Sequence, residues 1–435
     1  MDKSNFSTIL QQLTMLFDPF TLSEMSKDTG FCKRVRNIDP FEFIVSLITA
    51  MASGSVQSFA DLWRRFNEWT GLNVSYRAIY NQLSKEAFPE FMRQVVCHLL
   101  GICSEKVLSY PEGHAFAGFS RIVIQDGSSF ALKESLKEVF PGRFKTISPA
   151  AVELHATMDL LSDQPYQIVL APDTNGERQY LPEVETLTGC LSLMDRGYFD
   201  LKWFFALHEA KGSFIARAKE SLNPVIQSGF NEDGKALASV AGRQLKDLLA
   251  GNKLPKRKRS DLDATWRINK QEVTFRLILW WNKEEKRYSY LITNLPREQF
   301  STEDVSQAYR LRWQVELMFK EWKSYANLHR FDTDNPHLAE GLIWTSVATA
   351  IYKRFIAHAA QKVHGVEIST RKVAMSCGYL FIKLACRLLS TKPSGIRSEF
   401  KELLRFLSQN ATRAHPKRDR RTGRLASGLE PVGCS

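Results

Sequence analysis

Three acidic side chains, Asp126, Asp195 and Glu316, have the surroundings expected of residues that hold metal ions. Each aspartate ends a short apolar run, RIVIQD or CLSLMD, and active-site groups gather at strand ends in α/β sheets. Two carboxylates on neighbouring strands repel each other, and an oxygen-liganded Mg²⁺ or Mn²⁺ ion relieves that repulsion. A third carboxylate allows two metals, about 3.5–4 Å apart, to contact the attacking and leaving oxygens of a phosphodiester. The three acids therefore predict metal-dependent phosphodiester chemistry.

Glu316 belongs to a predicted helix over residues 302–325. At about 100° per residue, Tyr309, Arg312, Glu316 and Lys323 fall within an arc of about 60°. The other side of the helix carries an apolar stripe: Leu311, Val315, Met318 and Trp322. Taken alone, a charged helix face is usually just solvated, and an aspartate after a strand is usually a turn or cap residue. The combination of three acids with basic neighbours favours a site whose Arg and Lys bind phosphates.

The spacing Tyr309-x2-Arg312-x3-Glu316-x6-Lys323 resembles the signature of the IS-four group of bacterial insertion-sequence transposases. These are DDE enzymes with an RNase H-like catalytic core. The segment QDGSSFAL resembles the group's first-aspartate segment, and MDRGYFD resembles its second. A β-rich insertion between the second aspartate and the glutamate is a further mark of the group. The resemblance covers about residues 119–365.

This resemblance implies an enzyme that binds the ends of an insertion sequence and catalyses metal-dependent DNA cleavage and strand transfer, by way of hairpin ends. The three acids would hold two Mg²⁺ or Mn²⁺ ions, and Tyr309, Arg312 and Lys323 would contact DNA phosphates. The partners implied are double-stranded DNA, both inverted-repeat ends and target, and a second copy in a homodimeric synaptic complex. In some relatives a tryptophan of the insertion stacks on a flipped base, although such residues are more often strand core. The candidates are Trp266, Trp280 and Trp281.

Two other functions fit part of the pattern. One is an RNase H-like DNA nuclease that cuts without strand transfer. The other is a DNA-binding protein with a catalytically dead core. The presence of all three acids and all four signature residues argues against decay of the site, and a joining assay separates the three functions.

The expected fold is α/β, with an RNase H-like core interrupted by a β-rich insertion and flanked by N-terminal and C-terminal helical domains. We expect a strand that ends at Asp126 and a turn at Gly127 and Ser128. We also expect that the last strand of the insertion, over 288–294, returns to the main sheet. The expected order is a helical DNA-binding domain at 1–119, core at 120–217, insertion at 218–297, core with the glutamate helix at 298–365, and C-terminal helices with a basic tail at 366–435.

Further DNA contacts are predicted in the helical domain. A helix from Phe59, the turn TGLNVS and a helix capped by Ser75 form a possible helix-turn-helix, and an ordinary helical hairpin fits equally well. Its candidates for DNA contact are Arg77, Tyr80, Asn81 and Gln82.

Basic residues elsewhere are also candidates. Arg196 follows the second aspartate and would contact phosphate or pair with a carboxylate. The run in the insertion is either a solvated loop or a contact to the DNA backbone, and we favour DNA. It consists of Lys256, Arg257, Lys258 and Arg259. His155 is interpreted as structural, because a lone histidine usually is.

The bulk composition agrees with these interpretations. The 435 residues carry a formal charge of +12, which favours an anionic partner such as nucleic acid. The seven cysteines include no C-x-x-C pair, which argues against a disulfide framework and a zinc knuckle. No signal peptide and no apolar run of about 18 residues is present, so no membrane association is expected. We expect a bacterial cytoplasmic protein associated with the nucleoid.

Overall fold

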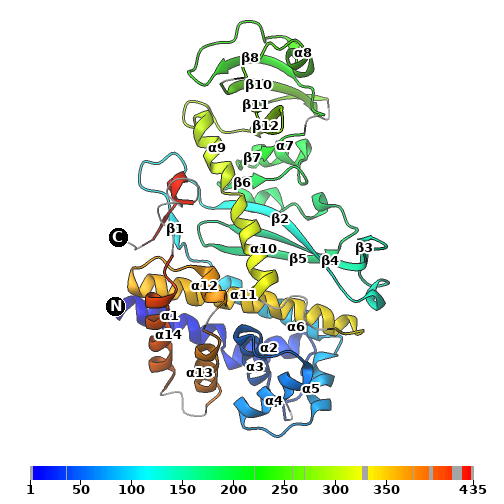
Figure 1. Cartoon of the computed structure of the whole chain (residues 1–435), viewed down its shortest axis with the longest axis vertical. Helices are drawn as coiled ribbons and strands as arrows, with labels where there is room; N and C mark the ends of the chain where they lie inside the picture. The colour runs from blue at the N-terminus through cyan, green and yellow to red at the C-terminus, as the bar shows by residue number, and fades with distance from the viewer. Residues whose placement is uncertain are drawn as a thin grey trace.

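The computed structural model describes residues 3–35, 37–219, 221–256, 258–268, 270–325, 332–375, 377–390, 395–413 and 424–432. A layer of helices forms one end of the molecule, a mixed sheet forms the middle, and the insertion forms the other end (Figure 1). The α/β class is therefore confirmed. Most of the predicted basic tail, 414–423, lies outside the described residues.

Five strands form the central sheet, in the order β5-β4-β2-β6-β7. The antiparallel part consists of β2, β4 and β5, whereas β6 and β7 run parallel to β2. Their bounds are β2 Ile122–Ala131, β4 Ser148–Asp159, β5 Gln164–Pro172, β6 Leu191–Met194 and β7 Ser213–Arg217. The short strand β3 (Pro141–Phe144) extends the sheet beyond β4, and the helix α7 (Leu201–Glu209) connects β6 to β7.

The predicted end of β2 at Asp126 is wrong, because the strand continues for five more residues. Gly127 and Ser128 were expected to turn, but the antiparallel ladder with β4 continues through both of them to Ala131. A Cβ atom on Gly127 would lie 2.5 Å from Oε1 of Glu153. The glycine therefore serves close packing against β4 instead of a turn.

The insertion is an antiparallel continuation of the same sheet. Its strands follow β7 in the order β12-β11-β10-β8-β9. Their bounds are β8 Val225–Asn231, β9 Arg243–Gln244, β10 Ser260–Ile268, β11 Gln271–Asn282 and β12 Arg287–Thr293, with one short helix, α8 Leu245–Ala250. The pairing of β12 with β7 confirms the predicted return to the main sheet.

The helices of the two chain ends pack together in one layer around α11 (Pro336–His364). This helix contacts α1, α3, α6, α12 and α14, and it is drawn beneath the sheet in Figure 1. The N-terminal helices are α1 Lys3–Leu16, α2 Pro19–Asp28, α3 Pro40–Ser53, α4 Phe59–Thr70, α5 Tyr76–Leu83 and α6 Phe88–Ile102. The C-terminal ones are α12 Thr370–Met375, α13 Gly378–Leu388 and α14 Ile396–Asn410. Short strands β1 (Leu108–Ser109) and β13 (Glu430–Pro431) pair antiparallel.

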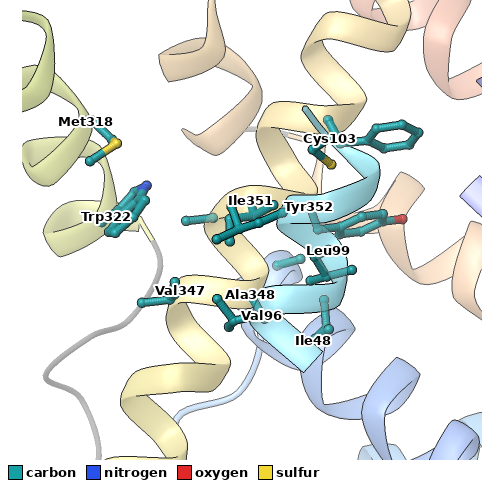
Figure 2. Close-up of a cluster of buried hydrophobic side chains, with 14 of the residues drawn as sticks. Ile48, Val96, Leu99, Cys103, Met318, Trp322, Val347, Ala348, Ile351 and Tyr352 are labelled. Carbon is teal, nitrogen blue, oxygen red and sulfur yellow. The ribbon is translucent and has the colours of Figure 1, made fainter. Parts of the chain in front are cut away.

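The helix that carries Glu316 joins the sheet to this helical layer. Met318 and Trp322 face Val347 and Ile351 of α11 (Figure 2). All four side chains are fully buried, and the rest of the predicted apolar stripe is buried as well. Burial of this stripe holds the opposite face of the helix against β2. In the part of the chain that the structure describes, no helix combines the length and apolar character needed to cross a membrane.

Candidate active site

The first two acids lie side by side because of the register between β2 and β6. These strands are parallel, and their last paired residues are Gln125 and Met194. Asp126 and Asp195 follow directly, at the same edge of the parallel part of the sheet. Strand β6 ends there, as predicted, whereas β2 continues beside β4 with Asp126 opposite Ala156. The pairing of β2 with β6 thus brings together Asp126 and Asp195, which lie far apart in the sequence.

The predicted single helix over 302–325 consists of two helices, α9 (Thr302–Arg310) and α10 (Trp313–Tyr325). Between them, Leu311 and Arg312 donate their backbone N–H groups to carbonyls three residues earlier, at 3.0 Å. This is the tighter hydrogen-bonding pattern of a 3₁₀ turn, and it interrupts the continuous α-helix that was expected. No glycine or proline marks the interruption, so the sequence pattern does not reveal it.

Arg312 lies at the centre of the acidic residues. Its guanidinium pairs with Asp126 at 3.3 Å and also with Glu316. The Tyr309 hydroxyl donates a hydrogen bond to Asp195 at 3.5 Å. The structure therefore brings together residues from β2, the end of β6 and the α9–α10 segment.

Lys323 lies on the far side of the same hollow. Its ammonium donates a hydrogen bond of 2.6 Å to the backbone carbonyl of Ser129 in β2. The hollow between β2 and α10 has a volume of about 410 Å³ and is open to solvent. Among the residues that line it are Asp126, Ser128, Glu316, Lys320 and Lys323. Acids and cations thus share one accessible surface, which suits a metal-bound phosphodiester.

The burial of Asp126 raises its pKa to about 6. The negative charges of Asp195 and Glu316 raise it as well, and the Arg312 guanidinium offsets part of the increase. Burial lowers the pKa of Lys323. Because the charged form of Asp126 is disfavoured in the protein alone, a cation bound there gains by relieving that penalty.

The donor chemistry fits a hard cation, because Asp126, Asp195 and Glu316 are carboxylates beside one open hollow. Across the described ranges, however, no three His, Cys, Asp or Glu side chains are close enough to hold one ion together. The Arg312 guanidinium lies between Asp126 and Glu316 and forms an ion pair with each.

A buried polar network under β2 was missed by the sequence reasoning. Gly127 faces Glu153, His155 and Tyr198, on the opposite side of the strand from Asp126. His155 shares a hydrogen bond of 3.0 Å with the Tyr198 hydroxyl. Burial lowers the pKa of His155 to about 4 and raises that of Glu153 to about 7. The polar alternation in VELHATMD was the available signal, since a strand buried on both faces is usually apolar throughout.

The predicted helix-turn-helix segment forms two helices, α4 and α5. Ser75 caps α5 by accepting a hydrogen bond from a backbone N–H, as predicted. Arg77 and Asn81 are exposed, whereas Tyr80 and Gln82 are partly buried. Exposure makes the first two residues accessible to DNA, and DNA binding by this segment stays a prediction.

The tryptophan candidates lie in β10 and β11 of the insertion. Trp266 is buried at 8% exposure, and its place in a core cluster fits the alternative interpretation of strand core. Trp280 and Trp281 are partly buried. The Lys256 ammonium lies 4.5 Å from the centre of the Trp281 ring, so this tryptophan presents a face to a cationic loop.

The basic loop of the insertion is partly engaged with acids. Lys258 pairs with Asp233, and Arg259 pairs with Glu303 in the first turn of α9. Arg257 lies outside the described residues. Arg196 is exposed beside the second aspartate. Contact of these four residues with DNA stays a prediction.

Comparison with known families agrees with this geometry. The family described as the transposase DDE domain matches residues 117–352, which is more than half of the chain. The chain belongs to this family. It is therefore a DNA transposase, of a class that uses divalent metal ions. The matched region contains all three acids and the four signature residues.

Individual relatives include transposases of bacterial insertion sequences. The transposase of IS231C from Bacillus thuringiensis subsp. berliner is 24% identical over 357 residues, which cover 74% of each chain. The transposase of IS1151 from Clostridium perfringens is 22% identical and covers 72% of this chain and 73% of its own. A solved structure of the piggyBac transposase synaptic complex with hairpin DNA aligns over 91% of this chain and 85% of its own, with 12% identity and a TM-score of 0.46.

Proposed function

We propose that this transposase binds the ends of an insertion sequence and catalyses metal-dependent cleavage and strand transfer at Asp126, Asp195 and Glu316. The carrying observation is that both aspartates and Glu316 meet around Arg312, with Tyr309 bonded to Asp195. The Tyr-Arg-Glu-Lys spacing supports membership of the IS-four group. Three distant segments have no structural need to place so many ionisable groups together, and a phosphoryl-transfer site explains them.

Each side chain has a definite part in this proposal. The three acids hold two Mg²⁺ or Mn²⁺ ions, which when bound activate the attacking oxygen and neutralise charge on the phosphate. Arg312 leaves its carboxylate partners and binds a DNA phosphate with its planar guanidinium. Lys323 supplies a point charge to a neighbouring phosphate, and Tyr309 orients Asp195 through its hydroxyl before it contacts the backbone.

The wider architecture supports the remaining parts. The mixed order β5-β4-β2-β6-β7 supports an RNase H-like core, with the insertion continuing from β7. We propose that the helices over 1–119 and the loop at Lys256 bind the transposon ends. Two copies would hold two ends in the synaptic complex. If hairpins form, the partly buried Trp280 and Trp281 are better placed to stack on a base than the buried Trp266.

The decisive variant is Glu316→Gln, which removes one metal ligand and keeps the shape of the side chain. We expect loss of Mg²⁺- or Mn²⁺-dependent cleavage at the transposon end, while binding of the same DNA in a gel-shift assay is retained. Glu298→Gln, at an exposed position, is the matched control and should cleave normally. Cleavage at the wild-type rate by Glu316→Gln would contradict the assignment.

A second assay separates the reaction types. A pre-cut transposon end is incubated with a supercoiled target plasmid and divalent metal. Joined products support strand transfer. Cutting of an uncut end without joining identifies a nuclease, and binding without either reaction identifies a protein with a dead core.

A further inference from the structure

A second cavity lies on another face of α10 from the hollow described above. Its volume is about 270 Å³, and α10, α11, α12 and the segment around Arg424 surround it. Five cationic side chains line this basic cavity: Lys320, Arg354, Arg371, Arg413 and Arg424. The acids Asp163 and Glu321 also line it. Of these five cations, Lys320 also lines the hollow of the three-acid site, and the other four do not.

Both acids at the base of the basic cavity already pair with one buried arginine. Arg354 is 4% exposed and pairs with Asp163 at 3.1 Å and with Glu321 at 3.4 Å. His358 also contacts Asp163, at 3.1 Å. Burial alone would raise the pKa of Asp163, but Arg354 and His358 outweigh it, so the pKa is lowered. Both acids are thus engaged with partners in the wall of the cavity.

The rim carries the excess positive charge. Lys320 and Arg371 are exposed and form no ion pair within the described ranges. Arg413 and Arg424 share one acid, Glu367, at 3.1 and 2.7 Å. Among the described residues, and with Glu367 counted, five Lys and Arg side chains face three acids, an excess of two positive charges without His358. An anion with two charges, or two singly charged groups, matches that excess.

We propose that the basic cavity binds phosphate groups, and that DNA strand phosphates are their source. The volume is slightly below the range of about 300–1,000 Å³ typical of small-ligand pockets, so it suits one nucleotide-sized phosphate ester and excludes a duplex. Lys320 lines both the basic cavity and the hollow that holds Glu316. A strand that leaves the active site can therefore continue over α10 to the rim at Arg371. This site is independent of the three acids and adds a binding surface to the proposed function.

The test is the salt dependence of DNA binding, measured in EDTA so that no cleavage occurs. Each phosphate contact contributes about 0.7–0.9 to the slope of log K against log salt concentration. Arg371→Ala should reduce the slope by about this amount. Arg405→Ala, at an exposed position on α14, is the matched control and should leave the slope unchanged. Unfolding temperatures of both variants show whether the fold is intact.

A second arm identifies the source of the phosphate. Inorganic phosphate and thymidine monophosphate are titrated into wild type and Arg371→Ala by calorimetry. A reduced slope for Arg371→Ala supports DNA as the source. Binding of the small phosphates that Arg371→Ala abolishes, with an unchanged DNA slope, supports the site but overturns DNA as its ligand. An unchanged slope and no small-phosphate binding overturn the proposal. Because cleavage is not measured, failure here is distinguishable from failure of the three-acid assignment.

Discussion

Replacing Asp126 by asparagine should stabilise the metal-free protein near neutral pH while abolishing cleavage. The protein raises the pKa of this carboxyl from 3.8 to about 6, mainly by burial. A difference of about two pKa units corresponds to a cost of about 3 kcal/mol for keeping the group ionised in the folded state. Asparagine keeps the acceptor for the Gly127 N–H, a bond of 2.9 Å, without the buried charge. Arg312 retains Glu316 as a partner.

The effect has a defined pH window. Below about pH 4, Asp126 is protonated in both folded and unfolded chains, so wild type and variant should be equally stable. Between about pH 4 and 6 the folded protein retains a proton that the unfolded chain has lost, so the stability of wild type falls as pH rises. Above pH 6 the full difference of about 3 kcal/mol favours Asp126→Asn.

Thermal unfolding in EDTA at pH 4.5 and pH 7.5 measures this difference. An unfolding entropy of about 2.1 cal/mol/K per residue makes 3 kcal/mol equal to about 3 °C for cooperative unfolding of 435 residues. Glu138→Gln, at an exposed loop position, is the control and should show no comparable gain. A variant that is no more stable than wild type at pH 7.5, or whose advantage shrinks as pH rises, would refute the reasoning. Added Mg²⁺ should raise the unfolding temperature of wild type only.

Three further changes test other parts of the structure. Arg312→Gln removes the cation that pairs with Asp126 and Glu316, so Mn²⁺ should bind about tenfold more tightly in the absence of DNA, while strand processing slows. Calorimetry measures the Mn²⁺ affinity, and weaker Mn²⁺ binding would contradict the site geometry. Gly127→Ala places a Cβ 2.5 Å from a buried carboxylate oxygen and should reduce both unfolding temperature and cleavage; wild-type values would show that β2 has room there. Trp322→Ala should cost about 3–5 kcal/mol in denaturant unfolding, because the side chain is fully buried against α11, and a loss below 1 kcal/mol would argue against that packing.

Local patterns predicted several elements of the structure. The apolar run before Asp195 is a strand, Ser75 caps a helix, and the stripe that ends in Trp322 is buried. Each of these features depends on residues that are close together in the sequence, and periodicity and capping rules describe such local relations.

Other features of the structure depend on long-range packing, which local sequence patterns do not reveal. Gly127 is a residue type that is common in turns, yet its pairing with β4 keeps it in the strand. The interruption at Leu311 and Arg312 carries no glycine or proline. The contact of Arg312 with Asp126 joins residues 186 positions apart, so the helical angle could indicate a common face but not the partner. Tyr309, Arg312 and Glu316, which the helical spacing groups together, also lie together in the structure, but the spacing does not reveal their ion pairs.

The shared packing around α11 also determines when, during synthesis of the chain, the N-terminal helices can complete their packing. Helix α6 ends at Ile102 and its partner α11 begins at Pro336, so more than 200 residues are synthesised between them. At about 5–20 residues per second this interval is roughly 10–50 s. During that time the N-terminal helices lack the helix on which they pack. The N-terminal helices therefore complete their packing only after the catalytic segment has been synthesised.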